Sequence, residues 1–155
     1  MKRFNQRTQT LLSLQAAVRA LPKSADCRIA GKRGNQFIRL NIGDVPMVFD
    51  PISHIEVRVC VPQFFELPSG RQAQETAAAL NDYLDRGKFL VRGSSLVYVS
   101  ILDSPHGGVP EETNLRSAVA EALLSVLLVI RACEATVRRK RASHALSRCR
   151  HPELN

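Results

Sequence analysis

The amino-acid sequence predicts an α+β domain with the element order helix-β-β-β-helix-β-β-helix. Three observations support this prediction. Apolar residues recur at three- and four-residue steps in three segments, as in amphipathic helices. Between these segments the chain alternates apolar and polar residues, the two-residue period of a half-buried strand. Glycine, proline and aspartate separate the segments and mark the turns.

The first predicted element is a helix over residues 5–21. Pro22 follows it directly and cannot continue a helix. Four apolar residues lie on one face, which we expect to dock on the core: Leu11, Leu14, Val18 and Leu21.

Three strands are predicted next, over residues 38–42, 46–49 and 55–61. The first and second are separated by Gly43-Asp44, a typical turn pair. The sequence leaves open whether residues 28–32 form a further short strand. The third strand carries the clearest alternation, with four apolar residues on one face: Ile55, Val57, Val59 and Val61.

A second helix is predicted over residues 71–86, and a β-hairpin follows it. Gly87 stands where a left-handed residue would cap the helix and reverse the chain. The hairpin arms are residues 89–91 and 96–102, joined by a turn that contains Gly93.

The last predicted helix covers residues 115–137, with Thr113 or Asn114 as its N-cap. Between residues 123 and 130 it is apolar almost all round, so several sides must be covered. We expect the sheet to cover one side and a second subunit another. The residues expected in the core and the dimer contact are Leu123, Leu124, Leu127 and Leu128.

The net charge of +8 is unevenly distributed along the 155 residues. Residues 1–35 carry eight Lys/Arg against one Asp, and residues 138–155 carry six against one Glu. Residues 36–137 carry eight Lys/Arg against twelve Asp/Glu. We therefore expect one domain over residues 1–137, whose centre, residues 36–137, is mildly acidic, and a basic, flexible tail over residues 138–155.

The element order resembles that of the YbjN family of bacterial proteins. The similar segments are LNDYLDRGKFLVRGSSLVYVSIL and then GGVPEE ahead of a long apolar helix, with Leu80-Asn81, Gly87-Lys88-Phe89 and Gly107-Gly108 as the shared positions. The resemblance covers about residues 4–137. That family is similar in fold to the class I chaperones of type III secretion. The resemblance implies a curved, five-stranded antiparallel sheet packed by helices, and a homodimer.

The same resemblance implies a non-enzymatic protein-binding module, either secretion-chaperone-like or a regulatory adaptor. Such modules hold an extended segment of a partner, for example a secreted effector, along apolar grooves and by adding a strand to a sheet edge. The residues expected to build the scaffold and to contact the partner are Ile55, Val57, Val59, Val61, Phe89 and Val91.

No residue pattern in the sequence predicts a catalytic, cofactor or metal site. His106 in SPHGG is interpreted as a loop residue. His144, Cys149 and His151 lack a fourth ligand at zinc spacing. The segment GKRGN, residues 31–35, lacks the pattern of a phosphate-binding loop and a helix after it.

An alternative function is nonspecific contact with nucleic acid through a run of four basic residues. Basic runs bind phosphates with an affinity that falls steeply with salt. They also serve as solvated tails or contact acidic partners. No aromatic residues are interleaved with the run, so no base-reading motif supports it. The residues are Arg138, Arg139, Lys140 and Arg141.

Cysteine usage and hydropathy predict a cytoplasmic protein without a membrane span. Four cysteines occur without any CxxC pair, as is typical of a reducing compartment. The longest apolar run, residues 122–130, is much shorter than the roughly 20 residues of a membrane helix. Residues 1–22 lack the apolar core of a secretory signal; an organellar transit peptide is the alternative for this Arg-rich, acid-free segment.

Overall fold

The computed structural model describes residues 2–104 and 109–150, which form helices packed on one antiparallel sheet. The predicted α+β class is confirmed. Six strands lie in the order β1-β2-β3-β4-β6-β5 in an open sheet, and every neighbouring pair is antiparallel. The elements are α1 (Lys2–Arg19), β1 (Ser24–Ala30), β2 (Phe37–Ile42), β3 (Val45–Pro51), β4 (Glu56–Glu66), α2 (Gly70–Asn81), β5 (Lys88–Arg92), β6 (Ser95–Asp103) and α3 (Glu112–Arg150).

The strand β1 makes the sheet six-stranded, where the element order had predicted five strands. The sequence left open a short strand over residues 28–32. The strand in the structure begins earlier and is longer, covering residues 24–30. Its register with β2 shifts between Ala25 and Arg28, and Asp26 has φ of 53°. Such a bulge interrupts the two-residue alternation on which the sequence prediction depended.

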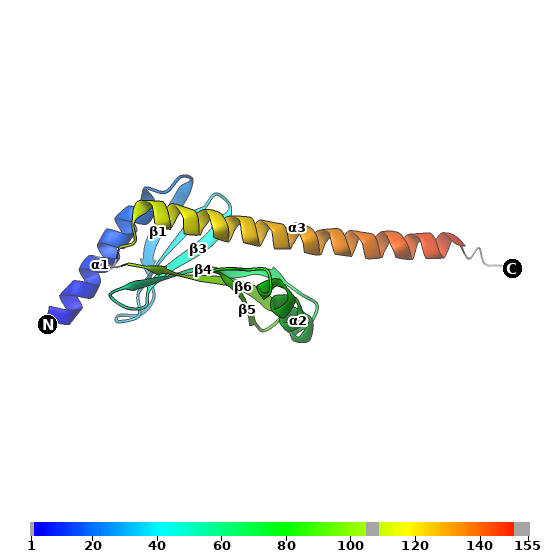
Figure 1. Ribbon diagram of the computed structural model, residues 1–155, viewed down its shortest axis with the longest axis horizontal. Helices are drawn as coiled ribbons and strands as arrows, with labels where there is room; N and C mark the ends of the chain where they lie inside the picture. The colour runs from blue at the N-terminus through cyan, green and yellow to red at the C-terminus, as the bar shows by residue number, and fades with distance from the viewer. Residues whose placement is uncertain (1, 105–108, 151–155) are drawn as a thin grey trace.

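The core lies between one face of the sheet and the helices α1 and α3. The predicted apolar face of α1 is confirmed, since Leu11, Leu14, Val18 and Leu21 are all buried. Figure 1 shows α3 running across the sheet and continuing beyond it, with α2 at the end where β5 and β6 lie. The sheet contributes the alternate residues of its strands, and α3 contributes Leu115, Ala118, Ala122, Val126 and Val129.

The second helix ends earlier than predicted, and Gly87 is needed for a different reason. The helix α2 stops at Asn81 and not at residue 86, with Asp82 as a right-handed C-cap. Gly87 does not have a positive φ, so the predicted left-handed cap is wrong. A Cβ at Gly87 would overlap the hydroxyl of Tyr98, and only glycine leaves room there. The predicted hairpin turn is confirmed, with Gly93 at φ 64°.

The last helix is longer than predicted at both ends. It begins at Glu112, so Thr113 and Asn114 lie in its first turn and do not cap it. Residues 138–150, expected as a flexible tail, continue the same helix. At about 1.5 Å per residue the helix is about 58 Å long, and its far half projects past the sheet (Figure 1). Within the described residues, no helix combines the length and apolar character that crossing a membrane requires.

Candidate functional site

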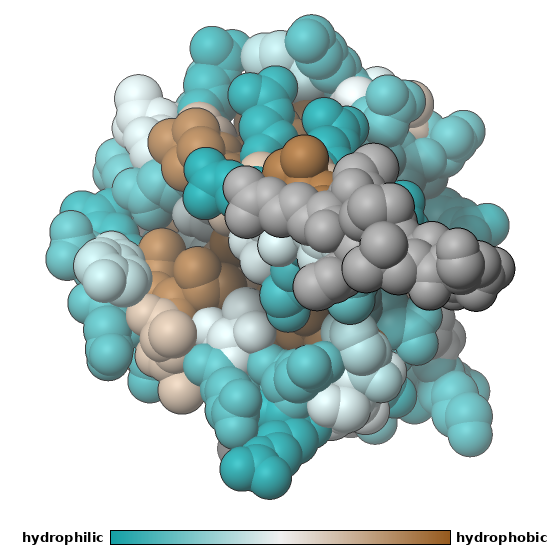
Figure 2. Space-filling view, turned by 90° about the vertical axis from the view of Figure 1, so that its right-hand side faces the viewer, coloured by the Kyte–Doolittle hydropathy of each residue, from teal (hydrophilic) through white to brown (hydrophobic). Residues whose placement is uncertain are grey.

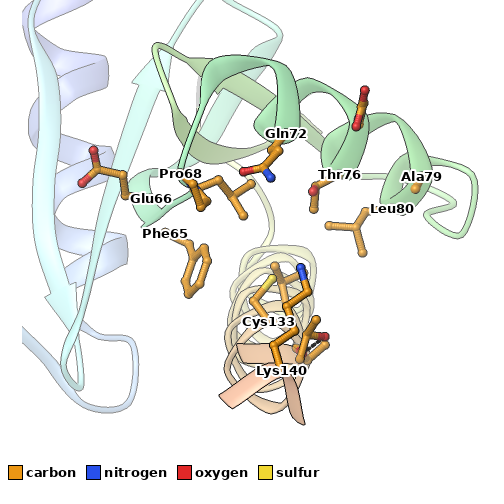
Figure 3. A pocket seen from close by; sticks show the side chains of 14 residues that line it. Phe65, Glu66, Pro68, Gln72, Thr76, Ala79, Leu80, Cys133 and Lys140 are labelled. Atoms are coloured by element: carbon orange, nitrogen blue, oxygen red, sulfur yellow. Dashed lines mark hydrogen bonds between the residues drawn. The ribbon is translucent and has the colours of Figure 1, made fainter. Parts of the chain in front are cut away.

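A groove opens between α2, α3 and the end of β4, and encloses a volume of about 950 Å³. Its walls are mainly apolar, and they come from two stretches far apart in the sequence, residues 65–80 and residues 129–140. Figure 3 shows Phe65 and Leu80 directed toward α3, with Cys133 on the opposite wall. The apolar lining includes Phe65, Leu67, Leu80, Val129 and Cys133.

The polar groups of the groove differ between its two walls. Glu66 lies at the end of β4 and Lys140 lies on α3 (Figure 3). Glu75, on α2, also lines the groove. Glu75 also forms an exposed ion pair with Arg71 at 3.1 Å, which water screens and which therefore leaves the carboxylate accessible. The groove thus combines an apolar floor with one acidic and one basic rim.

The position of α2 is fixed by a cap, by small residues and by a side-chain amide. Ser69 caps the helix by accepting a hydrogen bond from the Gln72 N–H at 3.2 Å. Ala73 and Ala77 are buried, and their small side chains allow α2 to approach the sheet closely. Because α2 packs at the β5 end of the sheet, its other face remains free to form a wall of the groove.

The outer edge of β5 is occupied by Asn81 from the end of α2. Asn81 Nδ2 donates to the carbonyl oxygen of Phe89 at 2.9 Å. The Phe89 N–H donates to Asn81 Oδ1 at 2.7 Å. The amide therefore makes the pair of hydrogen bonds that an added strand would make at this residue.

The other sheet edge, β1, is also protected. The bulge at Asp26 breaks the regular spacing of its backbone groups. The guanidinium of Arg19 donates to the carbonyl oxygen of Cys27 at 3.3 Å. Bulges and occupied backbone groups discourage strand addition. Both sheet edges are therefore poorly suited to pairing with a partner strand, whereas the groove is open to the side chains of a partner.

Most of the residues expected to contact a partner belong to the core. Val57, Val59 and Val61 are completely buried and Phe89 is 3% exposed. They form the scaffold, and a partner could touch them only if the core opened. Ile55 precedes β4 and is exposed, while Val91 is half-buried. The groove residues were missed because no local pattern in the sequence connects β4, α2 and α3.

Three of the four leucines expected in a dimer contact are exposed on α3. Leu124, Leu127 and Leu128 keep 60%, 44% and 57% of their surface accessible, on the face turned away from the core. Leu123 is half-buried against the core. Figure 2 views the molecule from the end where α3 projects and shows brown apolar surface interrupting the teal polar surface.

The basic run is helical and accessible. Arg138, Arg139, Lys140 and Arg141 are exposed on the projecting half of α3. His144 is exposed on the same half. No group of three metal-ligating side chains occurs among residues 2–104 and 109–150. His106, Gly107-Gly108 and His151 lie outside the described residues.

The thiols give no sign of an activated nucleophile in the described part of the chain. Burial raises the pKa of Cys133, which faces the groove. Burial also raises the pKa of Cys27 and Cys60, although Arg19 and Arg58 act in the opposite direction. Since the thiolate is the reactive form, the raised pKa makes these thiols less reactive near neutral pH.

No protein-family model matches the chain, and no curated protein matches it either.

Proposed function

We propose that this protein is a non-enzymatic protein-binding module that holds a segment of a partner protein in the groove between α2 and α3. The observation that carries the proposal is the open apolar groove of about 950 Å³. A bound segment would place apolar side chains against Phe65 and Leu80. Polar groups of the segment would meet Glu75 on one rim and Lys140 on the other. The module would act as a secretion-chaperone-like protein or as a regulatory adaptor.

The groove is a better candidate than the sheet edges for holding that segment. Strand addition requires a row of unpaired backbone groups, and Asn81 occupies those of Phe89 on β5. The groove instead offers side-chain pockets, in which apolar contact supplies affinity and the rim charges supply selectivity.

We also propose that the module is a cytoplasmic homodimer. Leu124, Leu127 and Leu128 form an apolar strip that a second copy would cover. Single exposed leucines are ordinary, but three within two turns of one helix are typical of an interaction surface. The free thiols of Cys27, Cys60 and Cys133 are consistent with a reducing compartment.

The groove proposal is tested by filling the groove without disturbing the core. Ala79 is exposed and lines the groove, whereas its neighbour Ala78 is exposed and does not. We expect Ala79→Trp to reduce the capture of protein partners from nuclease-treated cell extract by about tenfold or more, and Ala78→Trp to leave capture unchanged. Quantitative mass spectrometry reads the result. Equal capture by Ala79→Trp and the wild-type chain would contradict the proposal.

Nonspecific nucleic-acid contact is the second candidate function. It is favoured by one observation, that Arg138–Arg141 are exposed on a part of α3 that projects beyond the sheet. If all four residues contact phosphates of a labelled DNA duplex, log K should fall against log salt with a slope of about −3.6. Replacing the four residues with glutamine should abolish the binding. A slope that the replacement leaves unaltered would contradict this candidate.

A further inference from the structure

The exposed face of α3 is apolar in the middle and oppositely charged toward its two ends. At about 100° per residue, Ala120, Leu124, Leu128 and Arg131 lie on one side of the helix. Val126 lies on the opposite side and is buried in the core. Ala120 and Arg131 are exposed like the leucines between them. These positions form a continuous seam that no described part of the chain covers.

The charges on either side of this seam are distributed asymmetrically along the helix. Residues 111–121 carry three glutamates and one arginine, a net charge of −2. Residues 131–141 carry four arginines, one lysine and one glutamate, a net charge of +4. Glu112 pairs with Arg116 at 2.9 Å, but both side chains are more than half exposed, so the pair is weak and leaves Glu112 available to a further cation.

We infer that two copies of this chain pair through the seam with their α3 helices antiparallel. When residue 126 of each copy lies at the two-fold axis, Leu124 is level with Leu128 of the second copy. Glu121 is then level with Arg131 of the second copy. Residues 138–141 are level with residues 111–114 of the second copy. Antiparallel pairing therefore sets the +4 segment of one copy against the −2 segment of the other at both ends.

A parallel pair would bring the two +4 segments together, and like charges at close range disfavour association. The antiparallel pairing thus gives the basic run an acidic partner within the dimer. The inference rests on the proposed homodimer and not on the groove. The groove takes Val129, Cys133 and Lys140 from α3, and these lie on a different side of the helix from the seam.

The molar mass of the full chain in solution tests the homodimer. Light scattering should give twice the monomer mass of 17.2 kDa, and Leu124→Glu with Leu128→Glu should reduce it to the monomer mass. The matched control is Leu12→Glu, on α1, where Leu12 is 54% exposed. This variant should remain dimeric. A monomeric wild-type chain would overturn both the homodimer and the pairing. A dimer that survives the double substitution would overturn the pairing through the seam.

Cysteine cross-linking tests the orientation separately. Ser117 and Ala135 are exposed on the seam side and are level with each other in the antiparallel pair. In a Cys149→Ser background, a chain with Ser117→Cys and a differently tagged chain with Ala135→Cys are mixed and mildly oxidised. A mixed disulfide without cross-linking of either chain to itself is expected. Self-cross-linking of each chain alone, in a protein of dimer mass, would leave the homodimer intact and overturn the antiparallel orientation.

Discussion

The two halves of α3 belong to one helix but are held by different forces. Residues 112–130 pack on the sheet and bury Leu115, Ala122 and Val126. Residues 131–150 project past the sheet, and of their described side chains only Cys133 is partly buried. Packing stabilises the first half, whereas the second half depends on local helix propensity and on whatever it contacts. Residues 112–130 therefore build the fold, whereas residues 131–150 are available for binding.

The largest loss of stability should come from a substitution in the buried core. Val57→Asp places a carboxylate where the side chain is completely buried, so we expect a loss of about 3–5 kcal/mol in the free energy of unfolding. Ile101→Asp on the neighbouring strand, where 55% of the side chain is exposed, is the control and should cost much less. Urea unfolding measures both. A free energy of unfolding that hardly changes in Val57→Asp would refute the assignment of β4 to the core.

An intermediate effect is expected at the end of α2, where Asn81 closes the β5 edge. Asn81→Ala removes both hydrogen bonds to Phe89 and should cost about 1–3 kcal/mol. It should also promote association through the exposed strand, seen as a rise in mass with concentration. If Asn81→Ala is as stable as the wild-type chain and keeps the same mass, the edge does not depend on this amide.

The smallest effect should come from the projecting half. Ala142→Gly weakens the helix locally by about 1 kcal/mol, yet we expect the global free energy of unfolding to change little, since this half is not packed on the sheet. Hydrogen exchange should accelerate only around residue 142. Ala122→Gly, in the packed half, should instead lower global stability. If both substitutions destabilise the whole protein equally, the proposed difference between the two halves is wrong.

The periodicity of apolar residues predicted the core well, because a helix or strand that buries one face carries apolar residues at a regular spacing in the sequence. The alternation in β2 and the four-residue steps in α1 both identify residues that are buried, such as Leu40 and Leu14. The bulge in β1 interrupts this alternation, and the sequence therefore indicated only an uncertain strand at residues 28–32 where the structure has Ser24–Ala30. Gly87 was identified as special, but the cause is Tyr98, a contact that the local sequence does not reveal.

The groove could not be predicted because it depends on contacts between elements, which the local sequence does not reveal. Phe65, Leu80 and Cys133 come from three elements, and only the tertiary packing brings them together. The exposed leucines of α3 were better anticipated, because a helix that is apolar all round has more apolar surface than one sheet can cover. The length of α3 was underestimated, since the change from apolar to basic residues at 137 looks like a domain boundary although the helix continues.

Site-specific photo-cross-linking in living cells tests most directly whether the groove binds a partner protein. A photoreactive side chain is placed at Gln72, which is exposed and lines the groove, or at Gln74, which is exposed two residues away and does not line it. The proposed function predicts that a partner protein is cross-linked at position 72 and not at position 74, and that Ala79→Trp abolishes the cross-link. Equal cross-linking at both positions, or none at position 72, would contradict the groove as the binding site.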